Sequence, residues 1–293
     1  MRKRILAAAA SLLLLALLPT ASSGAADLDL KLPKGAIPLE TGGYALELKA
    51  PVPDWYTPQL HQRVIAAGRD GVPVPAEASK EYSSLAFMGI RPGAWILSPG
   101  GCTTNFVFGS SGSYSIGTAG HCGSVGEEVT LIALPGVLMN IGRISKSVDN
   151  GIGDDFALID IYPEMQEFVN PSMSYFAGPT GSAQPAFGDV VVHSGHGLVI
   201  GTGGTPRVGV VTYVGPGEET QADTAFGWDG AGSPGDSGSA VRNVTGAAAG
   251  NLTHIVVGGQ YIPAIIAGTT APHMQQLAGK SIATAPLTPD PLP

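Results

Sequence analysis

Short apolar runs separated by clusters of glycine, proline and serine dominate the chain from about residue 94 onward. Runs rich in Val, Ile, Phe and Thr that are bounded by turn residues are typical of β-strands. We expect strands over residues 94–97, 103–108, 115–118, 129–134, 139–145, 156–161, 190–192, 208–214, 240–242, 255–257 and 262–267. About ten short strands at this spacing predict an all-β body, built as antiparallel barrels or a sandwich. A short helix is expected at residues 272–278, followed by a proline-rich tail over 284–293 that we expect to be frayed.

The first 26 residues have the pattern of a secretory signal peptide. Basic residues 2–4 precede an apolar run over 5–18, and small residues follow up to Ala26. The apolar run is too short to span a membrane comfortably, and the small residues suit cleavage before Asp27. We therefore expect a secreted, extracellular protein with no membrane association after the signal is removed.

Residues 27–93 are proline-containing and only weakly periodic, with a short helix expected over 59–67. We interpret this stretch as a pro-region or N-terminal extension that precedes the main domain at residues 94–283. The pattern does not decide between these two interpretations.

Composition limits the classes of partner. A chain of 293 residues with 44% hydrophobic and 13% charged residues can bury a large core. The formal net charge is -8, and no run of Lys or Arg occurs after the first four residues. This distribution argues against nucleic acid or an anionic membrane as a partner and favours a neutral or peptide ligand.

The chain has two cysteines, Cys102 and Cys122. Export into an oxidising compartment predicts that they form a disulfide. A structural zinc site would need further ligands, and no CxxC pair or HxxxH spacing accompanies these thiols, so we expect neither a metal nor another cofactor.

Glycines surround Ser237 in the stretch Ser233, Pro234, Gly235, Asp236, Ser237, Gly238, Ser239. A nucleophilic hydroxyl needs an exposed turn, and neighbouring backbone amides can stabilise the oxyanion of a tetrahedral intermediate. Gly235 and Ser237 would supply those amides. A serine in a glycine-rich turn is common, however, so the interpretation as a nucleophile requires a base elsewhere in the chain.

The candidate base is His121, which Cys122 would hold in place through its disulfide. The remaining histidines are expected to be surface or locally hydrogen-bonded residues: His61, His193, His196, His254 and His273. We choose Asp155 as the carboxylate that orients the base, because it opens the apolar run 156–159. The adjacent Asp154 would point the other way on an extended chain. The other nearby carboxylates, Asp149 and Asp160, are expected to be solvated.

Together these motifs resemble the chymotrypsin-type serine proteases, and most closely the bacterial secreted branch that includes the streptogrisins and alpha-lytic protease. The resemblance rests on residues 118–122, on 155–158 and on 235–238, and on their His, Asp, Ser order. It implies two six-stranded antiparallel β-barrels, over about 94–175 and 186–270, with the active site in the cleft between them. Cys102 falls where the family has the partner of the cysteine that follows the histidine.

Several positions depart from the family pattern or lack a partner. Ser239 replaces the usual glycine, as in the glutamyl endopeptidase branch. In the family, Asp236 is normally buried against a liberated N-terminus or a nearby cation, and the sequence identifies neither here. If a new N-terminus is required, the enzyme is expected to be made as a zymogen; the resemblance to the bacterial branch implies instead a pro-region that assists folding, and residues 27–93 would serve for either.

The family spacing places Ala231 at the base of the primary specificity pocket, with Gly232 and Ser233 beside it. Since no aspartate stands at the base, an apolar or medium-sized P1 residue is expected, although the nearby Asp229 leaves a basic preference open. The substrate backbone is expected to pair near residues 268–270.

These inferences predict a monomeric, secreted serine endopeptidase that cleaves protein or peptide substrates through an acyl-enzyme. One alternative is a catalytically inactive binding protein on the same fold, and another is a specificity of the glutamyl endopeptidase type. An esterase of the α/β-hydrolase class would have its serine first in chain order and glycine at position 239, and this chain has neither.

Overall fold

The computed structural model describes residues 32–78, 89–134, 136–197, 206–262 and 264–288. Residues from Lys34 onward form one compact unit, to which the following description is confined. The expected signal peptide lies outside the described residues. Among the helices in the described ranges, none is both long and apolar enough to cross a membrane.

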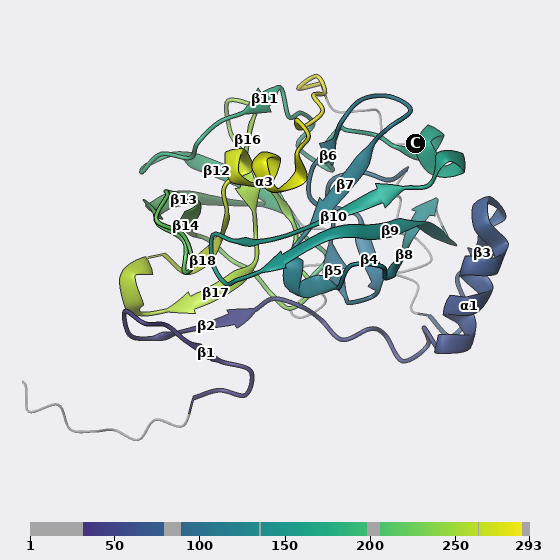
Figure 1. Cartoon of the computed structure of the whole chain (residues 1–293), viewed down its shortest axis with the longest axis horizontal. Coiled ribbons are helices and arrows are strands. Elements are labelled where there is room, and N and C mark those ends of the chain that lie inside the picture. The colour runs from purple at the N-terminus through teal and green to yellow at the C-terminus, as the bar shows by residue number, and fades with distance from the viewer. Residues whose placement is uncertain (1–31, 79–88, 135, 198–205, 263, 289–293) are drawn as a thin grey trace, which may run out of the picture. The chain divides into compact units, whose positions relative to one another are not determined.

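Strands make up most of the regular structure of this unit, as Figure 1 shows. The α-helices within the described ranges are α1 (Pro58–Ala67) and α3 (Ala271–Ala278). The strands are β1 (Ile37–Pro38), β2 (Tyr44–Glu47), β3 (Val72–Pro73), β4 (Trp95–Ser98), β5 (Cys102–Thr103), β6 (Val107–Phe108), β7 (Ser115–Thr118), β8 (Glu128–Leu134), β9 (Val137–Asp149), β10 (Asp155–Ile161), β11 (Gly181–Ser182), β12 (Val190–Ser194), β13 (Pro206–Gly215), β14 (Ala225–Asp229), β15 (Ala240–Asn243), β16 (Ala247–Asn251), β17 (His254–Val257) and β18 (Ile266–Thr269).

The first sheet closes into a barrel. Its strand order is β5-β4-β8-β9-β10-β7-β6, and the short β3 pairs with β9. Because β5 and β6 lie on one segment, residues 102–108, that segment pairs with β4 at one end and with β7 at the other. A ring of six strands results, filled by a core that includes Ile96, Leu131, Ile141 and Ile159.

The second sheet has the order β1-β2-β17-β18-β14-β13-β12-β15-β16-β11. A bridge between Gly250 and Thr270 connects β16 to the end of β18, so β18, β14, β13, β12, β15 and β16 also form a six-stranded ring. Around this ring, β17, β2 and β1 extend the sheet on one side, and β11 adds a parallel pair with β16. The expected all-β fold with two antiparallel barrels is confirmed.

Two strands of the second barrel were missing from the sequence prediction, and a third was shifted. β16 has the sequence Ala-Ala-Ala-Gly-Asn, whose residue types have low β-propensity, so its pairing partners determine its conformation. β14 is short and contains a central glycine. The run expected at 262–267 becomes a strand only from Ile266, because a 3₁₀ turn occupies Gly259–Tyr261.

Residues 50–78 pack against the first barrel. Helix α1 begins after Thr57, whose hydroxyl accepts a hydrogen bond from the Leu60 amide at 3.2 Å. Its buried face carries Leu60 and Val64, which share a core cluster with side chains of β4, β8 and β9. This part of the N-terminal stretch is therefore built into the core of the domain.

The start of the C-terminal tail is also held in place, contrary to the expectation that it is frayed. The Ala285 amide donates to the carbonyl of Pro179 at 2.7 Å, and the Gly178 amide donates to the carbonyl of Pro286 at 2.9 Å. Residues 289–293 lie outside the described ranges.

Candidate active site

Ser237 lies in a tight turn that only glycines permit. Gly235 and Gly238 have φ angles of +107° and +89°, a region that other residues rarely adopt. A Cβ at Gly238 would lie 2.1 Å from the Thr103 carbonyl oxygen, and one at Gly235 would lie 2.6 Å from the Trp95 ring. The turn thus packs closely against the first barrel, and Ser237 itself is fully buried.

His121 approaches this serine from the first barrel. It lies in a 3₁₀ turn, Gly120–Cys122, that the Cys102–Cys122 disulfide ties to β5. The Nε2 atom of His121 is 2.7 Å from the Ser237 hydroxyl oxygen, and its Nδ1 atom is 2.6 Å from Oδ2 of Asp155. The structure therefore brings the three predicted residues into one hydrogen-bonded row.

Asp155 is fully buried at the start of β10. Its Oδ1 atom accepts hydrogen bonds from the amides of Gly120 at 2.5 Å and His121 at 3.2 Å, which leaves Oδ2 for the imidazole. The neighbouring Asp154 has a different environment, since its carboxylate contacts His273 at 2.8 Å. Alternation along the extended chain separates the two carboxylates.

Two side chains that the sequence analysis did not select hold Asp155 in position. The Thr269 hydroxyl accepts a hydrogen bond from the Asp155 amide at 3.1 Å, and the Asn251 side-chain amide donates to the Asp155 carbonyl at 3.1 Å. Asn251 also accepts from the Thr269 amide at 3.0 Å. Both residues come from the second barrel, so no local motif near Asp155 indicates them.

Charge and burial shift the pKa values of His121 and Asp155 in opposite directions. Burial by itself would lower the pKa of His121, but the adjacent Asp155 carboxylate outweighs it and raises that pKa above its ordinary value. Burial would raise the pKa of Asp155, but His121 and the amide donors lower it overall. Asp155 therefore stays ionised and accepts the Nδ1 proton, which leaves the lone pair on Nε2 facing the Ser237 hydroxyl.

Three further histidines are buried rather than at the surface. Burial lowers the pKa of each to about 4, so all three are neutral near pH 7. We call them the buried neutral histidines: His193, His196 and His254. His254 is the one closest to the row, with its ring centroid 5.6 Å from that of His121, and it is hydrogen-bonded locally to Thr253.

Asp236 has a cationic partner that the sequence did not reveal. Its carboxylate forms a buried ion pair with Arg207 and accepts hydrogen bonds from the amides of Gly197 and Ser233, each at 2.8 Å. Arg207 lies on β13 opposite His193 of β12, so the pairing of these strands brings it beside the serine turn. The question that the sequence left open is answered by a cation within the chain.

The expected pocket residues lie in different surroundings. Ala231 is exposed, and its carbonyl accepts a hydrogen bond from Arg207 at 3.1 Å. Ser233 is buried and contacts Asp236. Gly232 faces an apolar space, because a Cβ there would lie 2.8 Å from Cδ1 of Leu48 and 2.9 Å from Cδ1 of Ile266. Asp229 is exposed at the end of β14.

The amides of Gly235 and Ser237 point at one oxygen atom. Both donate to the carbonyl of Leu48, at 2.5 Å and 3.2 Å respectively. The chain before Leu48 pairs with β17, whereas substrate backbone is expected to pair near residues 268–270, which stays a prediction. Those residues belong to β18 and its end, which pair with β14 and β17 and contact Asn251.

Potential metal ligands near His121 are already engaged within the described residues. Cys102 and Cys122 are joined in the disulfide, and both ring nitrogens of His121 contact Asp155 or Ser237. The carboxylates of Glu47 and Asp149 also lie near this imidazole. The chemistry that this arrangement supports is transfer of a proton between the serine, the imidazole and a leaving group.

Comparison with family models gives no match, and no curated protein matches the sequence. Solved structures do resemble the chain. Thermobifida fusca Protease A is 21% identical over 68% of this chain and 98% of its own, with a TM-score of 0.48. Nocardiopsis protease is 21% identical over 66% of this chain and 98% of its own, with a TM-score of 0.46. A glutamic acid specific serine protease, described as using a histidine triad in substrate binding, is 16% identical over 66% of this chain and 100% of its own, with a TM-score of 0.49.

Proposed function

We propose that this protein is a secreted serine endopeptidase. The observation that carries the proposal is the row of hydrogen bonds in which Ser237 lies 2.7 Å from His121 and His121 lies 2.6 Å from buried Asp155. A nucleophile, a base and a group that orients the base are the components of acyl transfer by a serine hydrolase.

In the proposed mechanism His121 accepts the Ser237 proton at Nε2 as the hydroxyl oxygen attacks the scissile carbonyl. The amides of Gly235 and Ser237 hold the oxyanion that forms, and Asp155 stabilises the imidazolium. His121 then donates its proton to the leaving amine. Water, activated by the same imidazole, releases the acyl group as a carboxylate and restores Ser237.

The backbone contacts of residues 44–50 around the serine support an internal bond of a peptide as the substrate. Backbone groups that accept an extended chain lie on both sides of the serine: Thr253 and β17 on one side, and Gly101 on the other. A site of this form accommodates residues before and after the cleaved bond, as an endopeptidase requires. The N-terminal pattern of residues 1–26 and the disulfide favour secretion.

We further propose an apolar P1 preference. The space beside Gly232 is lined by Leu252 and Ile266, and its occupant is the side chain of Leu48. Because the described lining is apolar and Asp229 is exposed, neither the glutamyl nor the basic preference has support from these contacts. The inactive binding-protein alternative is disfavoured because all three side chains have competent types and spacing.

Ser237→Ala tests the proposal. We expect turnover of a peptide substrate to fall by at least about 10³-fold, with residual catalysis from the oxyanion donors. A fluorophosphonate probe should label the wild-type protein at Ser237 and fail to label the variant. Ser110→Ala, at an exposed serine on the same chain, serves as the control and should keep full activity. Normal peptidase activity in Ser237→Ala would refute the proposal.

A further inference from the structure

The segment from Tyr44 to Ala50 lies across the candidate active site as an extended peptide. Figure 1 shows β2 beside β17, with which it pairs antiparallel, Glu47 opposite His254 and Ala45 opposite Val256. The pairing continues past the end of β2, since the Leu48 amide donates to the Thr253 carbonyl at 3.1 Å. The main chain is therefore held along the whole stretch that leads to the serine.

On the far side of the serine the same chain is held again. The Ala50 amide donates to the Gly101 carbonyl at 2.8 Å, and the Gly101 amide donates to the Ala50 carbonyl at 3.1 Å. The peptide bond between Leu48 and Lys49 therefore lies between two backbone contacts, one with Thr253 and one with Gly101.

The Leu48 carbonyl occupies the position of an acyl group under attack. Its oxygen accepts hydrogen bonds from both candidate oxyanion amides, Gly235 at 2.5 Å and Ser237 at 3.2 Å. The second donor belongs to the residue whose hydroxyl would attack. That hydroxyl donates to the Thr253 carbonyl at 3.1 Å, and the Leu48 amide donates to the same carbonyl. Donors arranged in this way are complementary to the developing oxyanion.

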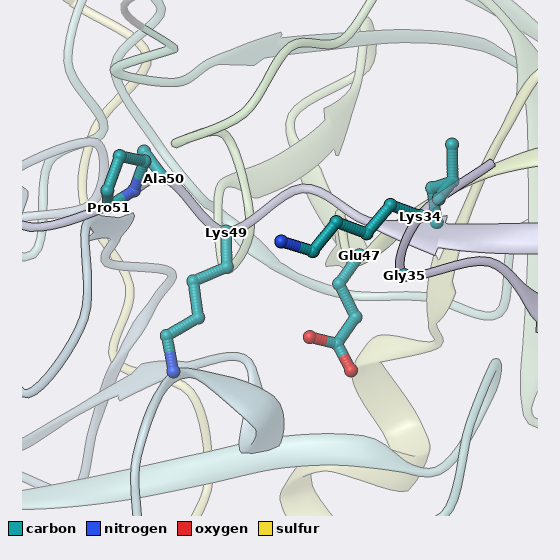
Figure 2. A pocket seen from close by; sticks show the side chains of 7 residues that line it. Lys34, Gly35, Glu47, Lys49, Ala50 and Pro51 are labelled. Atoms are coloured by element: carbon teal, nitrogen blue, oxygen red, sulfur yellow. The ribbon is translucent and has the colours of Figure 1, made fainter.

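Side-chain burial along the segment alternates as in a bound substrate. Leu48 is 2% exposed and packs in the core cluster of the second barrel, with Leu252, Trp228 and Ile266. Its neighbours Glu47 and Lys49 are exposed, and Figure 2 shows their side chains leaving the segment toward the same side. They border a pocket that also includes Lys34 and Pro51. Ala45 and Ala50 are buried as well, so Leu48 is the large apolar side chain that the segment inserts directly before the candidate bond.

Lys49 also makes a defined contact. Its ammonium group donates to the carbonyl of His121 at 2.8 Å. It lines a second pocket, of about 250 Å³, together with the acidic residues Glu127 and Asp149. These groups provide negative charge for a basic residue directly after the cleaved bond.

We propose that the protein cleaves its own chain between Leu48 and Lys49, and that residues 34–48 block the substrate groove until it does so. This inference rests on the proposed peptidase function. Ser237 Oγ forms a bond to the Leu48 carbonyl carbon, and its proton passes to His121. The bond from that carbon to the Lys49 nitrogen breaks as His121 returns the proton to the nitrogen. Water then hydrolyses the Leu48 ester, leaving a Leu48 carboxylate and a new N-terminus at Lys49.

The cut divides the N-terminal extension into two parts with different fates. Residues 34–48 are attached to the rest of the unit through the edge pairing of β2 with β17, the inserted Leu48, and the buried side chains of Leu39 and Ala45. All of these contacts are non-covalent, so the segment can leave after cleavage. Residues 50–78 include α1 and β3, which pack on the first barrel, so they remain. The cleaved bond has leucine at P1, at the end of the released segment, and lysine at P1′, at the start of the retained chain.

N-terminal sequencing and intact mass of the purified full chain test this inference. The wild-type protein should begin at Lys49, whereas Ser237→Ala should retain the Leu48–Lys49 bond. Leu48→Asp should abolish cleavage at this position and Leu48→Met should keep it. Val244→Asp, at an exposed apolar residue in the turn between β15 and β16, should process like the wild type. A wild-type chain with this bond intact, or cleavage of the bond in Ser237→Ala, would overturn the inference.

A second measurement separates failure of this inference from failure of the proposed function. In Leu48→Asp the apolar pocket no longer retains the segment, so a fluorophosphonate probe should label Ser237 and short peptides should be hydrolysed. If the wild-type chain stays intact while Leu48→Asp is labelled and active, the peptidase function holds and self-cleavage is wrong. If neither protein is labelled or active, the proposed function itself is wrong.

Discussion

Gly232→Ala should change the choice of the P1 residue more than it changes catalysis. Gly232 does not have the positive φ that would make alanine strained, so the backbone can accept the substitution. The added Cβ would lie 2.8 Å from Cδ1 of Leu48 and 2.9 Å from Cδ1 of Ile266. Ordinary carbon contacts are about 3.5–4.0 Å, so a leucine at P1 would have to withdraw by roughly 1 Å.

The size of the effect follows from the loss of room for about one methyl group. In an apolar pocket one methylene is worth about 1–3 kcal/mol, or about 10–200-fold in kcat/KM. A substrate with alanine at P1 lacks the branched end that meets the new Cβ, so its rate should change little. The ratio of kcat/KM for leucine over alanine should therefore fall by at least about tenfold in the variant.

Two peptides of sequence Tyr-Ala-Leu-Glu-X-Lys-Ala-Pro, taken from residues 44–51 with leucine or alanine as X, measure this ratio directly. Gly181→Ala is the matched control, because a Cβ at Gly181 would meet no atom within 4 Å. The control should leave the ratio unchanged. If Gly232→Ala lowers both rates equally, or neither, Gly232 is not part of the P1 pocket and the assignment of Leu48 to that pocket is wrong.

Three further predictions concern charge. Arg207→Gln leaves the Asp236 carboxylate buried without its cation, so the free energy of unfolding measured in urea should fall by about 3–5 kcal/mol. The control Arg69→Gln removes an exposed ion pair with Glu167 and should cost less than about 1 kcal/mol. Equal losses in the two variants would contradict the prediction. Because protonated His121 accepts no proton, kcat/KM should fall as the pH drops through the raised pKa of His121, with a midpoint above about 6.5 in a pH-rate profile. A midpoint below that value would contradict the pairing of His121 with an ionised Asp155. The buried neutral histidines bind protons in the unfolded chain below about pH 6.5 but in the folded chain only near pH 4, so between these values each lowers the free energy of unfolding, by about 2 kcal/mol at pH 5. The raised pKa of His121 offsets part of this loss. If Ser237→Ala is as stable in urea at pH 5 as at pH 7, the predicted loss of stability is wrong.

The parts of the site that local sequence could predict are those built by short rigid motifs. Glycines around Ser237 and the cysteine after His121 indicate a tight turn and a tethered base because few residue types fit those backbones. Apolar runs likewise predicted most strands of both barrels. These features depend on contacts within a few residues, so the sequence alone is informative about them.

The parts that could not be predicted depend on long-range register. Arg207 reaches Asp236 only because β13 pairs with β12 and passes the serine turn. Thr269 and Asn251 support Asp155 from strands about one hundred residues away in the chain. Leu48 has no local feature that distinguishes it from other leucines. Its role depends on β2 pairing with β17, which no pattern within residues 27–93 indicates.

The state of the site before cleavage decides what kind of inhibition the N-terminal segment exerts. The Asp236 carboxylate is already paired with Arg207, so the serine turn does not need a new α-amino group to fold. The Gly235 and Ser237 amides already point at a carbonyl oxygen, and His121 already contacts the serine. The candidate catalytic groups are therefore already in place while residues 44–50 cover them. Residues 34–48 then inhibit by covering the site and not by distorting it. A substitution that weakens the packing of Leu48 in its pocket should therefore expose an active site without any change in the two barrels.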